Sequence, residues 1–432
     1  MLIAVETIIQ AMAYVMQVVP VGTNLGLLRI MWAMSNGSFL KSRGAVHGAL
    51  AESGFTVGEI RRSWAALSYG SWRIDELLTT WAQQVASANQ WRERRYGGYR
   101  VRSIDFTAFW RPCLSGDVSK HYNRTAQKAL PAIVFGVMSL SGVIGSKRLP
   151  LLSGIERCAA TMSERTFRQQ FLEKVAQSSV ALEINVMDAG FTLSELQEKQ
   201  VKQLVLRLAK NCTARRNHRP LTLKRGRPTE FGELIRPLAR THRGKPIAAT
   251  AVADESGEFS QQGRTIPYRA WHQLVLSAQK PSPTNQTFSL YVFDDPLYTN
   301  PLVLATDLAI TAHNVYLVYL DRWPVEHPPL AAKQMMGLHR QFVFAAEARY
   351  RLPELALLTG NILAHVAAQL PPLPTGFWDR IPQPTPGRLR RLLARAVFPD
   401  LLEVDPQLRQ KNSLTNHLPK GVAAHRRHKP LL

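Results

Sequence analysis

Cysteine pairs and long uninterrupted apolar segments are largely missing from this sequence. Its 432 residues include three cysteines, Cys113, Cys158 and Cys212, which lie far apart and form no CxxC pair. This pattern argues against a zinc site and indicates a reducing compartment, so we expect a cytoplasmic protein.

The apolar opening MLIAVETIIQAMAYVMQVVPVG lacks the features of a signal peptide. It has no basic start and no small-residue cleavage site, and Glu6, Gln10 and Gln17 interrupt the apolar run. We therefore expect an amphipathic helix buried in the fold, and no insertion into a membrane.

Acidic residues are scarce relative to basic ones. Lys and Arg number 54 against 31 Asp and Glu, which gives a formal net charge of +23 and a pI near 10.4. Such a charge favours a polyanionic partner, because binding phosphates releases counterions. A membrane surface attracts the same charge, so the sign alone does not identify the partner. The length allows two or three domains, and the apolar fraction of 45% is typical of a globular protein.

Residues 1–95 have the pattern of a helical N-terminal region. A turn at Ser53-Gly54 is followed by Thr56, a suitable N-cap, and then by an amphipathic helix that carries Arg61 and Arg62. A helix, a turn with glycine and a second basic helix is the outline of a helix-turn-helix, which would bind DNA through Arg61 and Arg62. A plain helical hairpin has the same pattern.

From Tyr99 the sequence alternates strand and helix patterns. YRVRSIDFTAFW predicts a strand that ends near Asp105, and 130–154 predicts one or two strands broken at Ser141-Gly142. A helix over 164–177, a strand that stops at Asp188, a helix over 192–200 and a strand over 201–209 follow. This order predicts an α/β fold with a mixed sheet over 96–350.

A basic, β-rich insertion is expected at about 211–300, followed by a strand at PLVLATDL. Residues 201–250 hold 13 Lys and Arg against two Glu. We expect the basic residues of this insertion to follow a DNA backbone; they are Arg215, Arg216, Arg219, Lys224, Arg225 and Arg227.

Residues 351–432 are expected to form a helical C-terminal region. It comprises a helix, a proline-rich linker, a basic helix with Arg388, Arg391 and Arg395 on one stripe, and a disordered tail, AAHRRHKPLL.

Three acids have a placement that suits metal-dependent chemistry. Asp105 and Asp188 follow strand patterns, and Glu326 lies on or beside a helix after the insertion. Carboxylate oxygens are preferred ligands of Mg²⁺, and a pair of such ions can activate a hydroxyl and stabilise the leaving oxygen of a phosphodiester. The alternatives are that each Asp caps a turn or helix, and that Glu326 and Lys333 form a surface pair.

The segment YLVYLDRWPVEHPPLAAK carries a recognisable spacing. Two residues separate Tyr319 from Arg322, three separate Arg322 from Glu326, and six separate Glu326 from Lys333. This pattern resembles the Tyr-Arg-Glu-Lys signature of a group of bacterial insertion-sequence DDE transposases. IDFTAFWRP and VMDAGF look like the first and second Asp motifs of that group, and the resemblance covers roughly Tyr99 to Tyr350.

The resemblance implies an RNase H-like (retroviral-integrase-like) catalytic core with Asp105, Asp188 and Glu326 as catalytic residues and ligands of Mg²⁺, for which Mn²⁺ would substitute. It implies cut-and-paste transposition: water nicks the element end, and the freed 3′-hydroxyl attacks a phosphodiester, in some members to form a hairpin. The partners implied are double-stranded DNA, as terminal inverted repeats and target, and a second copy of the chain on DNA, in the bacterial cytoplasm at the nucleoid.

Further DNA contacts follow from the same resemblance. Tyr319, Arg322 and Lys333 would contact phosphates at the element's end, since Arg and Lys supply charged donors and Tyr a neutral one. Trp323 would stack on a displaced base, or else pack in the core.

The signature departs from a regular helix at its prolines. Pro324, Pro328 and Pro329 predict that the regular helix starts near Pro328, or is kinked, with Glu326 at its entrance. Two alternatives to an active transposase remain: an inactive or domesticated DNA-binding relative that regulates transposition, and an RNase H-like repair or resolving nuclease.

Overall fold

The computed structural model describes residues 2–399 except 112, 115–118, 124, 221–228, 251, 341 and 375, and also describes Leu408. Three predicted DNA contacts, Lys224, Arg225 and Arg227, and the predicted disordered tail lie outside the described residues.

The N-terminal region is helical, as predicted. Its helices are α1 (Leu2–Met16), α2 (Thr23–Ser35), α3 (Ser38–Lys41), α4 (Val46–Glu52), α5 (Val57–Tyr69) and α6 (Ile74–Ala88). The apolar opening forms α1, and most of its side chains are buried. Thr56 caps α5, because its hydroxyl accepts a hydrogen bond from the backbone of Glu59 while the Glu59 side chain accepts one from the Thr56 backbone.

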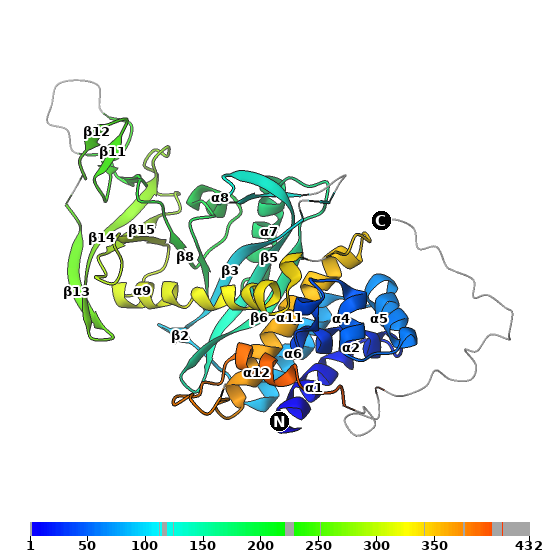
Figure 1. The fold of residues 1–432 in the computed structure, drawn as a ribbon. Coiled ribbons are helices and arrows are strands. Elements are labelled where there is room, and N and C mark those ends of the chain that lie inside the picture. The colour runs from blue at the N-terminus through cyan, green and yellow to red at the C-terminus, as the bar shows by residue number, and fades with distance from the viewer. Residues whose placement is uncertain are drawn as a thin grey trace.

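A mixed sheet of parallel and antiparallel strands forms the centre of the chain (Figure 1). Its first strands are β1 (Arg92–Glu93), β2 (Arg95–Tyr96), β3 (Tyr99–Trp110), β4 (Lys120–Asn123), β5 (Lys128–Ile144), β6 (Lys147–Arg157), β7 (Glu183–Met187) and β8 (Leu204–Arg207). Hydrogen bonds join five of them in the order β6-β5-β3-β7-β8, with β3, β7 and β8 mutually parallel and β5 antiparallel to its neighbours. The predicted α/β class with a mixed sheet is therefore confirmed.

Two predicted strand limits were wrong. β3 does not end near Asp105 but continues to Trp110, because Phe106 to Trp110 remain paired with β5. The β5–β6 turn lies at Gly145-Ser146, not at Ser141-Gly142, and Gly145 has the positive φ of 58° that glycine adopts readily. Gly142 instead gives space to the indole of Trp91, which a Cβ at this position would overlap.

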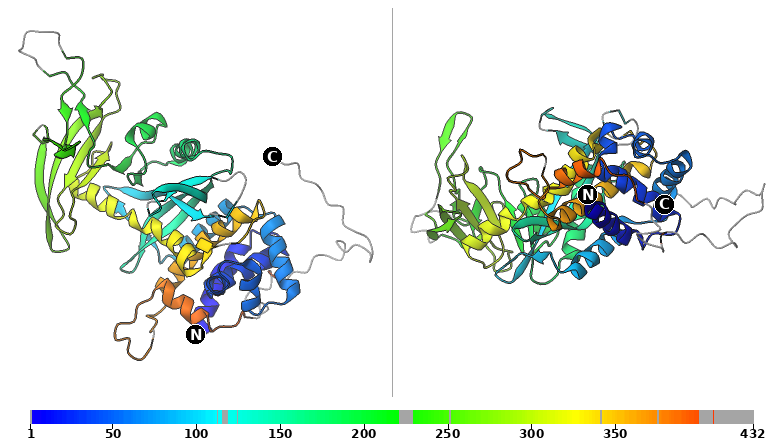
Figure 2. Two further views of the ribbon diagram at one scale, coloured as in Figure 1. Left: turned by 45° about the horizontal axis from the view of Figure 1, so that its top comes forward. Right: turned by 60° about the horizontal axis from the view of Figure 1, so that its bottom comes forward.

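The basic insertion continues the central sheet rather than forming a separate one. Its strands are β9 (Ala214–Arg216), β10 (Leu234–Ile235), β11 (Arg240–His242), β12 (Lys245–Ile247), β13 (Glu255–Gln261), β14 (Arg264–Leu276) and β15 (Phe288–Phe293), followed by β16 (Leu302–Thr306). β16 pairs with β8, and β15, β14, β9 and β10 follow in that order, while β11 and β12 form a small hairpin. Figures 1 and 2 show these strands extending away from the N-terminal helices.

Helices cover both faces of the sheet. α7 (Glu164–Ser178) and α8 (Leu193–Glu198) pack on one face, where Phe171 and Leu196 meet Ile104 and Met187. α9 (Ala312–Leu320) packs on the other face, where Val315 joins a separate apolar cluster that includes Ile184 and Val186. The alternation of side chains along β7 thus supplies both cores.

The signature segment forms a succession of irregular helical turns after α9. They are a 3₁₀ turn η1 (Trp323–Glu326), a short helix α10 (His327–Leu330), a π turn η2 (Ala331–Met335) and a 3₁₀ turn η3 (Leu338–Arg340). The prolines explain this irregularity, since each removes a backbone donor. Glu326 precedes α10, as the proline pattern predicted.

The C-terminal region contains α11 (Ala348–Gln369) and α12 (Pro386–Leu393). α11 packs against α1, α2 and β6 and so joins the N-terminal helices to the sheet (Figure 2). The predicted basic helix is shorter than expected, because α12 ends at Leu393 and leaves Arg395 outside its stripe. Among the described residues no helix is long and apolar enough to cross a membrane.

Candidate active site

Two of the predicted acids are neighbours because β3 and β7 are parallel and in register. Ile104 pairs with Met187, so the next residues, Asp105 and Asp188, lie at the same level of the sheet. Asp188 directly follows β7, as predicted, and its Oδ1 accepts a hydrogen bond from the backbone N–H of Ala189. Asp105 lies within β3, and its Oδ1 accepts one from the backbone N–H of Phe106.

The third acid reaches the same point from the helical turns after α9. Arg322 donates from Nη1 to Asp105 Oδ2 at 3.1 Å and from Nη2 to Glu326 Oε1 at 2.9 Å. Its Nη2 also lies 3.8 Å from Asp188 Oδ2. Asp105, Asp188 and Glu326, hereafter the acidic centre, therefore surround one guanidinium group.

The acidic centre borders a pocket of about 470 Å³. Its lining includes Asp105 and Glu326 and also Trp323, His327 and Lys333. A second pocket of about 300 Å³ lies beyond Trp323 and is lined by Arg207 and Tyr319 among others. Trp323 is exposed between the two pockets, so it does not pack in the core, which was the alternative expected from the sequence.

The pKa values in the acidic centre are shifted by burial and by neighbouring charges. Burial raises the pKa of Asp105 to about 6, although Arg322 and the Phe106 N–H oppose this shift. Burial would lower the pKa of Arg322, but the three acids outweigh it and raise that pKa. Asp105 is therefore mainly ionised at neutral pH, and Arg322 is charged.

Lys333 lies at the wall of the pocket with its ammonium group close to an aromatic ring. Its Nζ is 5.4 Å from the centre of the Phe109 ring, and burial lowers its pKa to about 8. Among the described residues this ammonium makes no hydrogen bond or ion pair. It is consequently available to a ligand in the pocket.

Tyr319 also faces the acidic centre. Its hydroxyl donates to Asp188 Oδ1 at 3.3 Å, and burial together with the Asp188 charge raises its pKa. Tyr319, Arg322, Glu326 and Lys333 thus lie around one site although they do not share one regular helix. The role of these four residues in binding or cutting DNA stays a prediction.

Two further residues at this site were not predicted. Arg207, the last residue of β8, has its Nη1 3.5 Å from Asp188 Oδ1. Asp321 is buried, and its backbone carbonyl accepts hydrogen bonds from the hydroxyls of Ser103 and Ser141. The strand pattern over 201–209, which contains Arg207, was visible in the sequence, but its pairing beside β7 was not.

The Asp321 side chain anchors the residue from the other side. Its carboxylate lies 2.5 Å from Arg94 Nε and 2.6 Å from the Tyr96 hydroxyl, and Arg148 lies 3.3 Å away. Asp321 at the end of α9 is therefore fixed to β3 and β5 through its carbonyl and to β2 and β6 through its side chain, which places Arg322 at the acidic centre.

The predicted DNA contacts outside this site fall into two groups. Arg61, Arg62 and Arg219 are exposed. Arg216 is buried and paired with both carboxylate oxygens of Asp254, and Arg215 donates to the carbonyls of Ser277 and Gly232. The DNA-binding role of all five stays a prediction, and only the first three present free guanidinium groups at the surface.

The donor chemistry of the acidic centre fits a divalent metal ion. Six carboxylate oxygens from three side chains are the hard ligands that Mg²⁺ prefers. Among the described residues, however, no three His, Cys, Asp or Glu side chains are already close enough together to hold one ion. Arg322 occupies the space between them, so a metal site would need these side chains to move.

Comparison with known proteins adds no identification. No protein-family model matches the sequence, and no curated protein shows significant similarity to it.

Proposed function

We propose that the protein is a DDE transposase that cuts and joins DNA at the ends of its own insertion sequence. The observation that carries the proposal is the meeting of Asp105, Asp188 and Glu326 around one guanidinium at the edge of a pocket. Three carboxylates repel one another, and the single charge of Arg322 does not balance all three, so the arrangement favours a further cation.

The architecture supports an RNase H-like core. Two of the acids lie on adjacent parallel strands, and the third lies on a helical segment packed beside them. The strand order β6-β5-β3-β7-β8 with an antiparallel β5 is the order expected of such a core. The signature spacing and the net charge of +23 point in the same direction.

The acidic centre would hold Mg²⁺ or Mn²⁺, which when bound activates the attacking hydroxyl and stabilises the leaving oxygen. Lys333 would place a phosphate in the pocket through its unpaired ammonium group. Tyr319 and Arg322 would add donors on the other side, and the exposed ring of Trp323 would stack on a base. The chain would act as a dimer on paired DNA ends in the bacterial cytoplasm.

One observation favours a second candidate, an inactive DNA-binding relative that regulates transposition. Arg322 partly neutralises the acidic centre from within the protein, and a protein that never binds metal would retain such a pairing. Both candidates predict DNA binding, and only the transposase predicts cleavage.

The deciding experiment is excision from a plasmid that carries this gene with its native flanks. The wild-type protein and Glu326→Gln are compared with Mg²⁺ and with EDTA. Excision by the wild type alone, and only with metal, would support the transposase. DNA binding without cutting by either protein would favour the regulatory relative, and unchanged cutting by Glu326→Gln would remove Glu326 from the acidic centre.

A further inference from the structure

Arg322 is buried, whereas an arginine that binds DNA directly would be expected to lie at the surface. Its side chain is 3% exposed, and its two terminal nitrogens contact all three acids at 2.9–3.8 Å. Its guanidinium is therefore directed into the protein and away from solvent.

No other cation takes this central position among the described residues. Arg207 contacts only Asp188, at 3.5 Å, and its side chain is half exposed. Lys333 contacts none of the three acids directly. Removing Arg322 would leave three carboxylates facing one another with little direct compensation.

A divalent cation and the Arg322 guanidinium cannot share this place. A metal ion bound by Asp105 and Asp188 would lie within a few ångströms of the guanidinium, where like charges repel strongly. Since both make their best contacts to the same oxygens, they compete for them.

We propose that Arg322 is an internal counter-ion of the acidic centre, which holds the three carboxylates together without metal and must be displaced before a divalent cation binds. This inference rests on the proposed function and concerns how the same site is regulated.

The local structure allows the side chain, but not the backbone, to move. The backbone is held where the Asp321 carbonyl accepts hydrogen bonds from Ser103 and Ser141. The Arg322 Nε–H, in contrast, is buried and has no hydrogen-bond partner among the described residues. The neighbouring ring of Trp323, at 5.4 Å from the guanidinium carbon, lies between two pockets that offer space.

Displacement would make the arginine available to a phosphate. Metal binding and DNA binding would then favour each other, since each removes Arg322 from, or keeps it out of, the acidic centre. Without DNA, the arginine would keep the metal affinity low and limit unwanted cutting.

The test measures Mn²⁺ binding to the full chain without DNA, by calorimetric titration and by the shift of the melting temperature. The variants are Arg322→Gln, the matched control Arg207→Gln, Glu326→Gln, and the double variant Arg322→Gln with Glu326→Gln. We expect Arg322→Gln to melt below the wild type in EDTA and to bind Mn²⁺ roughly tenfold more tightly or better. Arg207→Gln should change the Kd by less than about threefold, because its side chain is screened by solvent.

The outcomes separate this inference from the proposed function. One outcome is that the wild type and Arg322→Gln bind Mn²⁺ with equal affinity, and that adding Glu326→Gln to either protein abolishes binding. This result would overturn the role of Arg322 as a counter-ion but would support the metal site. No Mn²⁺ binding by either protein would overturn the metal site itself, and the inference with it.

A folding defect does not prevent the test. If Arg322→Gln is unfolded in EDTA and folds when Mn²⁺ is added, the metal has replaced the guanidinium, as proposed. If it is unfolded in both, Arg322→Lys is used, because a compact ammonium cannot reproduce the contacts that the planar guanidinium makes from two separate nitrogens. An Mn²⁺ affinity of Arg322→Lys no tighter than that of the wild type would then overturn the inference.

Discussion

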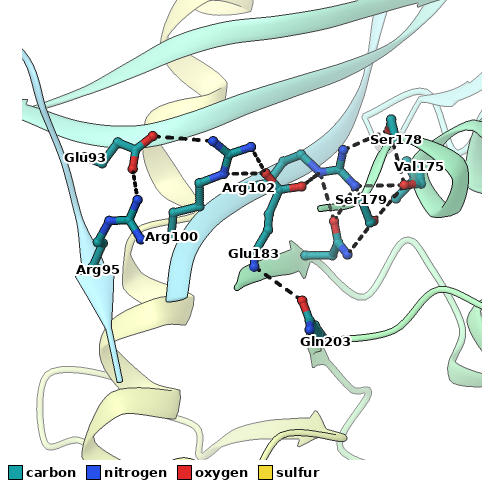
Figure 3. A network of polar contacts seen from close by, with 10 residues as sticks. Glu93, Arg95, Arg100, Arg102, Val175, Ser178, Ser179, Glu183 and Gln203 are labelled. Atoms are coloured by element: carbon teal, nitrogen blue, oxygen red, sulfur yellow. Dashed lines mark hydrogen bonds and ion pairs between the residues drawn. The ribbon is translucent and has the colours of Figure 1, made fainter. Parts of the chain in front are cut away.

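The same two strands, β3 and β7, position one arginine–carboxylate cluster near their starts and another further along, at Asp105 in the middle of β3 and at Asp188 directly after β7. At the starts, Glu183 lies between Arg100 at 2.7 Å and Arg102 at 3.1 Å (Figure 3). The remaining donors of Arg102 bind Asn185, Ser178, Ser179 and the Val175 carbonyl. At the second cluster, three acids share Arg322.

The two clusters differ in exposure and in charge balance. Glu183 is 1% exposed, and two arginines contact it. The side chains of Asp105, Asp188 and Glu326 are 31%, 30% and 42% exposed, and those of Asp105 and Glu326 line a pocket. The first cluster is closed and connects the strands to α7, whereas the second is open and short of positive charge. We infer that the first contributes stability and the second binds a ligand.

The largest expected effect separates the clusters by activity. Asp188→Asn should lower the cleavage rate at least about a thousandfold, because it removes a ligand charge where the reaction needs it. Its free energy of unfolding should change by less than about 1 kcal/mol. Glu183→Gln, assayed where it remains folded, should cleave at nearly the wild-type rate. A similar drop in cleavage for both variants would contradict the separation.

The next largest expected effect is a difference between the two clusters in their contribution to the free energy of unfolding. Arg102→Met should lower the free energy of unfolding by about 3–5 kcal/mol, because it leaves Glu183 buried with only Arg100 as its partner. Urea unfolding followed by circular dichroism measures this decrease. The control, Arg207→Met, removes a half-exposed interaction with Asp188 and should cost about 0.5 kcal/mol or less. Equal decreases would show that the closed cluster is not the more stabilising one.

A third effect concerns a buried neutral group outside both clusters. His365 on α11 is fully buried and bonds through Nε2 to the Pro150 carbonyl at 2.8 Å, and burial lowers its pKa to about 4. Below pH 6.5 the unfolded chain takes up a proton that folded His365 does not bind, so stability falls as the pH drops from 6.5 to 4. The decrease should reach about 3 kcal/mol.

His365→Gln isolates this contribution from those of the carboxylates. The variant is expected to be less stable at every pH but to lose about 3 kcal/mol less than the wild type between pH 6.5 and 4. Urea titrations at both pH values measure the difference. Parallel pH profiles for the two proteins would show that His365 is not kept neutral by burial.

The smallest effect applies the same contrast of exposed and paired arginines to DNA binding. Replacing Arg61, Arg62 and Arg219 together by Gln should reduce the slope of log K against log salt by up to about 0.9 for each phosphate that the variant no longer neutralises. Arg216→Gln should leave the slope unchanged and lower stability, because Asp254 already holds its guanidinium. Fluorescence anisotropy over a range of salt concentrations distinguishes the two results.

Much of the fold could be predicted because local patterns determined it. Thr56 as a cap, the strand that stops at Asp188 and the irregular turns at Pro324 and Pro328 all follow from neighbouring residues. Strand limits were less predictable, since the continuation of β3 beyond Asp105 depends on pairing with β5, about 30 residues away.

The candidate site was predictable as a set of residues but not as a geometry. The spacing from Tyr319 to Lys333 identified its members. It could not show that Arg322 turns inward to the acids, because that depends on Asp321 being held by Ser103 and Ser141 from two strands. Likewise, Arg216 is similar to Arg219 in sequence, and only the fold places Asp254 beside it.

The unbroken hydrogen bonding from β6 to β10 fixes the distance between the basic insertion and the acidic centre. The insertion is joined to β8 through β16, so its strands and those that carry Asp105 and Asp188 form one stiff body. The separation between the exposed Arg219, just after β9, and the acidic centre is then a fixed length. If Arg219 binds the DNA backbone, this length determines which phosphate lies over the acids. The sheet would then set the number of nucleotides between the bound phosphate and the cleaved one.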